Sequence, residues 1–256
     1  MAIIQTDQWL EKGWQRPEAL CERLEPYFPG RKPRDIYKEL AAFGMYRPSA
    51  AIGKEVQLLI ESGAWETMGR IFKKYRAKWN GSDIPIFIFP AAKRTSFLRK
   101  APPQKSGVSY PDKLFLFLPH MEDIKEWEAL FVHEYHHTCR INAIGKDVRE
   151  NTLRESMIME GLAEYAVLKE CGEPYQADWC TMYGPRELEG FYNKLLHDNL
   201  NLKRTDKEHD RLLFGGNGIP RLLGYCYGYY LVRNYYQSHR FSVESSFQIK
   251  ETSFFF

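Results

Sequence analysis

The chain has 256 residues, 44% of them apolar, which is enough for one or two compact domains and excludes a disordered protein. Lys and Arg number 36 against 33 Asp and Glu, and a net charge of +3 does not indicate a nucleic-acid partner. The longest apolar runs, residues 84–92 and 114–119, are shorter than the roughly 18 to 20 residues of a membrane span.

The N-terminus and the cysteines indicate the compartment. The first residues carry neither a basic region ahead of an apolar stretch nor a small-residue cleavage site, so we expect no signal peptide and a cytoplasmic protein. The five cysteines are widely spaced and form no C-x-x-C pair: Cys21, Cys139, Cys171, Cys180 and Cys226. This pattern is typical of reduced thiols that serve in packing.

Residues 1–82 are predicted to form an N-terminal helical region. Apolar residues recur there at spacings of three and four, as in Met68, Ile71, Phe72 and Tyr75. Residues 26–33, which contain Pro and Gly, are expected to be a loop between two helices. We predict a division between this region and a second one, residues 83–256.

A short sheet is predicted next. Residues 84–90 are β-branched and aromatic, bounded by prolines, and are expected to form a strand. Residues 108–110 and 113–118 flank a Pro111-Asp112 turn and predict a β-hairpin. We therefore expect a small antiparallel sheet, in which the strand 113–118 is the edge where an extended peptide could align.

Helices are predicted to fill the rest of the chain. One spans about residues 121–143, and a second opens at Thr152, whose spacing to Glu155 is that of a capping box, and continues toward Gly172. A long aromatic helix is expected over residues 222–236. The predicted fold class is α+β and mainly helical.

The first of these helices carries the pattern His133-Glu134-Tyr135-His136-His137, an H-E-x-x-H motif. At about 100° per residue, His133 and His137 lie one turn apart on one side of the helix, so both imidazoles can bind one metal ion. Glu134 projects about 100° away from His133 around the helix, so it can act on a water molecule on the metal instead of binding the metal. His136 is an alternative ligand, but only the frame with His137 completes the motif.

The second helix offers a third ligand, Glu160, 23 positions after His137. That interval allows a loop and a returning antiparallel helix. Two histidines and one glutamate with an open fourth position are typical of a catalytic zinc site. Glu164 lies one turn further on and can accept a hydrogen bond from the second ring nitrogen of His133.

At these residues the sequence resembles the gluzincin superfamily of zinc peptidases, which combines H-E-x-x-H with E-x-x-[AS]-D on a second helix. Glu164 stands here where that pattern has Asp. The runs IPIFIFP, DKLFLFL, HEYHHTCR, EGLAEYAV and GYCYGYYLVR are similar to the YjaZ-type family of predicted bacterial zinc-dependent proteases. The resemblance implies a cytoplasmic gluzincin-like peptidase with one zinc ion per chain, and it implies that Tyr225 or Tyr229 donates a hydrogen bond to the oxyanion. A packing role for both tyrosines, or a histidine donor, remains open.

The resulting hypothesis is a zinc metallopeptidase that acts on a peptide or protein substrate. Zinc bound by His133, His137 and Glu160 would activate a water molecule, and Glu134 would serve as the general base. The alternative is a non-catalytic zinc-containing protein that binds peptides or regulates a partner, although such a protein would not need Glu134. A di-iron bundle lacks its second E-x-x-H, and a deaminase lacks P-C-x-x-C. The oligomeric state is left open.

Overall fold

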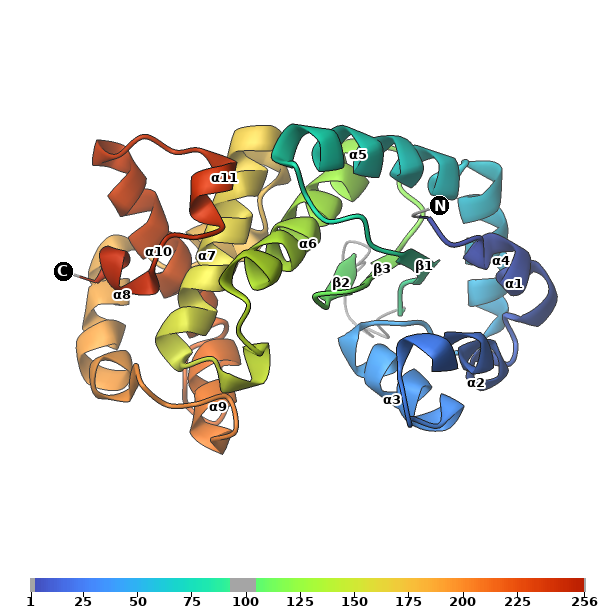
Figure 1. Ribbon diagram of the computed structural model, residues 1–256. Coiled ribbons are helices and arrows are strands. Elements are labelled where there is room, and N and C mark those ends of the chain that lie inside the picture. The colour runs from blue at the N-terminus through green and yellow to red at the C-terminus, as the bar shows by residue number, and fades with distance from the viewer. Residues whose placement is uncertain (1–2, 93–104, 256) are drawn as a thin grey trace. The chain divides into compact units, whose positions relative to one another are not determined.

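The structure is a computed structural model that describes residues 3–92 and 105–255 (Figure 1). The chain forms two compact units, Met1–Thr138 and Cys139–Phe256, and the division falls inside one helix. A division of this kind does not test whether residues 1–82 are a domain of their own, so the boundary expected at residue 82 stays a prediction.

The N-terminal part of the first unit is helical, as predicted. Its helices are α1 (Thr6–Gly13), α2 (Pro17–Leu20), the 3₁₀-helix η1 (Cys21–Tyr27), α3 (Pro33–Phe43), α4 (Ala50–Glu61) and α5 (Ala64–Trp79). The expected loop at residues 26–33 begins later, because η1 includes Pro26. Pro33 instead occupies the first turn of α3, where a missing N–H costs nothing.

The sheet has three strands: β1 (Ile86–Pro90), β2 (Ser106–Ser109) and β3 (Leu114–Leu118). The predicted hairpin is confirmed, since β2 and β3 pair antiparallel with Ser109 opposite Leu114. The sheet is mixed, however, and not antiparallel throughout, because β1 pairs parallel with β3. The order β1-β3-β2 makes β3 the central strand (Figure 1), so the expectation that residues 113–118 form the edge is wrong.

Burial distinguishes β1 and β3 from β2. Every residue of β1 and β3 is buried, as expected for strands covered on both faces, whereas β2 is half-buried throughout. The N-terminal helices contribute to this cover: the Thr6 hydroxyl donates to the Ile88 carbonyl at 2.5 Å and accepts from the Trp65 indole at 2.8 Å. The helical region and the sheet therefore share one core.

The helix α6 (Lys125–Ile144) follows the sheet and crosses the division between the units. The second unit continues with η2 (Val148–Glu150), α7 (Leu153–Glu170), η3 (Glu173–Tyr175), η4 (Asp178–Thr181), α8 (Pro185–Phe191), the π-helical turn η5 (Tyr192–Leu196), η6 (His197–Asn199), α9 (Lys207–Phe214), α10 (Leu223–Ser238), α11 (Val243–Ser246) and η7 (Glu251–Phe254). The predicted helices at 121–143, 152–172 and 222–236 are confirmed as α6, α7 and α10. No helix in residues 3–92 and 105–255 is long and apolar enough to cross a membrane.

Helices α7 and α10 form the centre of the second unit (Figure 1). They approach at two glycines: a Cβ on Gly161 would lie 2.4 Å from the Gly228 carbonyl oxygen, and a Cβ on Gly228 would lie 2.0 Å from the Met157 carbonyl oxygen. The two backbones are thus in direct contact. Leu162, Val232 and Phe254 bury their side chains beside this contact.

A buried arginine connects α6 to the segment after α11. Arg140 is only 4% exposed, and its guanidinium donates to the carbonyls of Ser246 at 2.7 Å and Ile249 at 3.0 Å. Burial lowers the pKa of Arg140 to about 10, which leaves the side chain charged at neutral pH. The charge is compensated by backbone dipoles of that segment.

Candidate metal centre

The rotation of α6 about its axis is set by an aromatic face. Tyr135 stacks on Trp79 of α5 with ring centroids 5.8 Å apart, and it meets Phe72 edge to face at 5.6 Å. The Tyr135 hydroxyl also donates to the Ser82 carbonyl at 2.8 Å. Because Phe131 packs one turn earlier on the same face, α6 has a fixed register against α5.

The two histidines of the motif lie at the distance that a shared metal requires. The Nε2 atoms of His133 and His137 are 3.1 Å apart, and their rings are perpendicular, at 88°. Two nitrogens bound 2.0–2.1 Å from a tetrahedral zinc ion would be about 3.3 Å apart. The pair therefore fits one zinc ion with a small adjustment of the side chains.

His136 lies in the core. It is fully buried, and its ring meets Trp79 edge to face at 6.4 Å. This is the position expected for the histidine outside the H-E-x-x-H frame, and it favours His137 as the ligand.

Glu134 is held by strand β2. It is 9% exposed, and the Ser109 hydroxyl lies 2.8 Å from its carbonyl oxygen and 2.5 Å from its carboxylate Oε2. Gly107, two residues earlier in β2, leaves space for the same side chain. Sequence reasoning missed Ser109, because a serine at the end of a strand carries no signal of such a contact.

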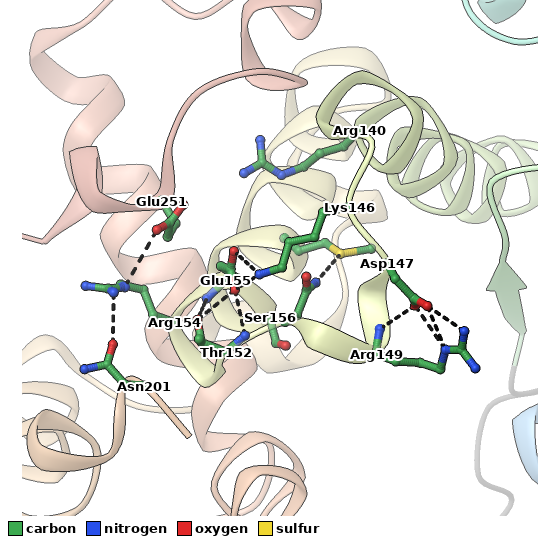
Figure 2. A network of polar contacts seen from close by, with 12 residues as sticks. Arg140, Lys146, Asp147, Arg149, Thr152, Arg154, Glu155, Ser156, Asn201 and Glu251 are labelled. Carbon is green, nitrogen blue, oxygen red and sulfur yellow. Dashed lines mark hydrogen bonds and ion pairs between the residues drawn. The ribbon is translucent and has the colours of Figure 1, made fainter. Parts of the chain in front are cut away.

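Glu160 comes from α7, whose start is firmly anchored. Thr152 and Glu155 form the predicted capping box, and Lys146 contacts both carboxylate oxygens of Glu155 at 2.7 Å (Figure 2). Arg154 in the same turn donates to Asn201 at 3.0 Å (Figure 2). Glu160 is half-buried, and one ligand atom from each of His133, His137 and Glu160 lies within 4.8 Å of the others. The donor types, two imidazoles and one carboxylate, are those that bind zinc.

Glu164 is buried one turn after Glu160, with 3% exposure. Its Oε1 accepts a hydrogen bond from the backbone N–H of Ala177 at 2.6 Å. The segment between α7 and α8 thus holds the carboxylate, and no motif in the sequence predicts this contact. The contact expected between Glu164 and His133 stays a prediction.

The two candidate tyrosines differ in their surroundings. Tyr229 is 2% exposed, its hydroxyl accepts from the Gln176 amide at 2.6 Å, and burial raises its pKa to about 12. Tyr225 is half-buried, with its ring edge to face against Trp179 at 5.3 Å. Both tyrosines have packing roles, and the oxyanion role stays a prediction.

Comparison with known proteins agrees with these observations. The family model described as "Predicted Zn-dependent protease (DUF2268)" matches residues 64–255. The uncharacterized protein YjaZ of Bacillus subtilis (strain 168) is 33% identical over 257 residues, covering 99% of this chain and 98% of that protein. The uncharacterized protein YjfC of the same organism is 20% identical over 211 residues, covering 75% of this chain and 69% of that protein. No solved structure matches at a significant level. The chain belongs to the family described as predicted zinc-dependent proteases.

Proposed function

We propose that the protein is a peptidase that binds one zinc ion through His133, His137 and Glu160 and uses Glu134 as its general base. The observation that carries the proposal is the 3.1 Å separation of the two histidine Nε2 atoms, together with a carboxylate oxygen within 4.8 Å. Two neutral imidazoles and one carboxylate leave a fourth position open, as catalytic zinc requires. The family description supports the same assignment.

A zinc ion in this position supplies Lewis-acid polarisation of the peptide carbonyl and lowers the pKa of water toward about 7. Glu134, adjacent to His133 in α6, accepts a proton from the attacking water and delivers it to the leaving nitrogen. Its low exposure keeps bulk water from competing for the carboxylate. Each of these residue roles belongs to the proposal.

Strand β2 is the proposed site of substrate alignment. Among the residues that the structure describes, β2 pairs only with β3, so its other edge offers main-chain N–H and C=O groups. An extended peptide can add to such an edge as a further strand. Because Gly107 and Ser109 of β2 contact Glu134, a peptide bound there would have its backbone near the base.

The test combines metal analysis with a cleavage assay. Elemental analysis of the purified chain should give one zinc per molecule, and a broad peptide library should be cleaved in a chelator-sensitive manner. Glu134→Gln should retain zinc and lower kcat by at least about 100-fold, the low end of what a positioned base contributes. Glu150→Gln, an exposed glutamate in η2, serves as the control and should cleave normally.

Two results would contradict the proposal. A chain without zinc, or with two metal ions, would refute the ligand set. A fully zinc-loaded chain that cleaves no peptide in the library would favour a non-catalytic peptide-binding protein.

A further inference from the structure

The Glu134 carboxylate is fixed from one side by strand β2. The Ser109 hydroxyl lies 2.5 Å from Oε2, a length typical of an O–H group that donates to a charged carboxylate. The same hydroxyl lies 2.8 Å from the Glu134 carbonyl oxygen, so it reaches both the backbone and the side chain of one residue. No described residue donates to the other oxygen, Oε1.

Gly107 of β2 also restricts the Glu134 side chain, through a steric contact. A Cβ at this position would lie 2.7 Å from Cγ and 2.8 Å from Cδ of Glu134, so the glutamate side chain rests against bare strand backbone. Residues 107 and 109 share one face of β2, because side chains alternate along a strand. The Glu134 side chain is therefore limited sterically by the Gly107 backbone and accepts a hydrogen bond from Ser109.

The end of β2 is itself held in place on two sides. The Thr138 hydroxyl, one turn after Glu134 in α6, donates to the Tyr110 carbonyl at 3.3 Å. The Tyr110 hydroxyl donates to Glu39 of α3 at 2.5 Å. Ser109, next in the chain, is thus fixed between the N-terminal helices and α6.

We propose that Ser109 is a positioning residue that holds Oε2 of Glu134 and leaves Oε1 to take the proton from the attacking water. The inference rests on the proposed function and extends it to a residue outside the motif. A base must be held within a fraction of an ångström for efficient proton transfer, and an adjacent hydrogen bond to a rigid strand supplies this restraint. Its loss should therefore reduce turnover and leave zinc and peptide binding intact.

The experiment compares three variants of the full zinc-loaded chain. Ser109→Ala should lower kcat by about 10- to 100-fold with KM and zinc content unchanged, the range expected when a reacting group is misplaced by about 1 Å. Ser109→Thr keeps the hydroxyl and should recover most of the lost turnover. Ser49→Ala is the matched control, because Ser49 is exposed before α4, makes no capping hydrogen bond with its side chain and lies outside β2, and it should behave as wild type.

Crystal structures of the wild type, Ser109→Ala and Ser49→Ala provide a readout that needs no activity. The Glu134 carboxylate should keep one position in the wild type and in Ser49→Ala, and should rotate or become disordered in Ser109→Ala. An unmoved carboxylate in Ser109→Ala, or equal losses of kcat in both alanine variants, would overturn the inference. If the wild type cleaves no peptide, the proposed function fails, and the crystal structures still decide whether Ser109 holds Glu134.

Discussion

The contact between α7 and α10 provides a sharp test of the fold, through Gly228→Ala. The added Cβ would lie 2.0 Å from the Met157 carbonyl oxygen and 2.6 Å from its carbonyl carbon. Both are backbone atoms inside a helix, so no side chain can rotate to make space.

The magnitude follows from these distances. Ordinary contact needs about 3.4 Å, so the two helices must separate by about 1.4 Å at this point. Overpacking of this kind lowers the free energy of unfolding by about 3 kcal/mol, the upper part of the usual range. The upper part applies because moving the helices apart also weakens the dispersion contacts between neighbouring side chains. The better helix propensity of Ala offsets about 1 kcal/mol. We expect a net loss of about 2 kcal/mol in the free energy of unfolding.

The assay is urea unfolding followed by far-ultraviolet circular dichroism. The urea midpoints of the variants are compared, provided that the unfolding free energy falls with urea at the same slope in each. Gly190→Ala is the matched control: it also lies in a helix, α8, and a Cβ there meets nothing within 4 Å. It should leave stability unchanged or raise it by up to about 1 kcal/mol. If Gly228→Ala were as stable as Gly190→Ala, the close approach of α7 and α10 would be refuted.

Three further outcomes are expected. His137→Ala should lose zinc in elemental analysis while His136→Ala retains it, and the reverse would show that His136 is the ligand. Glu164→Ala should stay folded and bind zinc about 10- to 100-fold more weakly in competition with a chelator, as when a carboxylate behind a ligating histidine is lost, whereas equal affinity would leave Glu164 without that role. Burial alone would raise the pKa of Glu155, but hydrogen bonds from Lys146 and Thr152 hold this pKa below its ordinary value of 4.5. The contribution of Glu155 to the free energy of unfolding is therefore complete above pH 4.5 and is lost as the pH falls. Glu155→Gln should therefore lower stability at pH 7 by about 1 kcal/mol and flatten its decline in acid, and an unchanged acid profile in urea unfolding would contradict this.

Local signals predicted much of the fold. The capping box at Thr152 depends on residues three apart, and the hairpin around Pro111-Asp112 depends on two adjacent strands, so both are readable from the sequence. The spacing within α6 likewise predicts that two imidazoles share one side of a helix, and the structure has their Nε2 atoms 3.1 Å apart.

Contacts between distant segments were not predictable in the same way. The parallel pairing of β1 with β3 joins strands separated by more than 20 residues, and nothing in either run of apolar residues indicates which strand is central. The contact of Ser109 with Glu134 also depends on how the sheet packs on α6. In the sequence Gly228 is one small residue within an aromatic run. Its role in the close approach of α7 and α10 becomes visible only in the structure, where the Met157 backbone lies opposite.

The hydrogen bonds of Arg140 and the packing of Phe254 affect the order in which parts of the chain fold during translation. Arg140 donates to carbonyls of residues 246 and 249, and the ring of Phe254 completes the apolar packing beside α7 and α10. While the ribosome is still translating α10, the guanidinium lacks these acceptors and the packing lacks that ring. The second unit therefore matures only after residues 246–254 have emerged, whereas residues 1–138 can fold earlier.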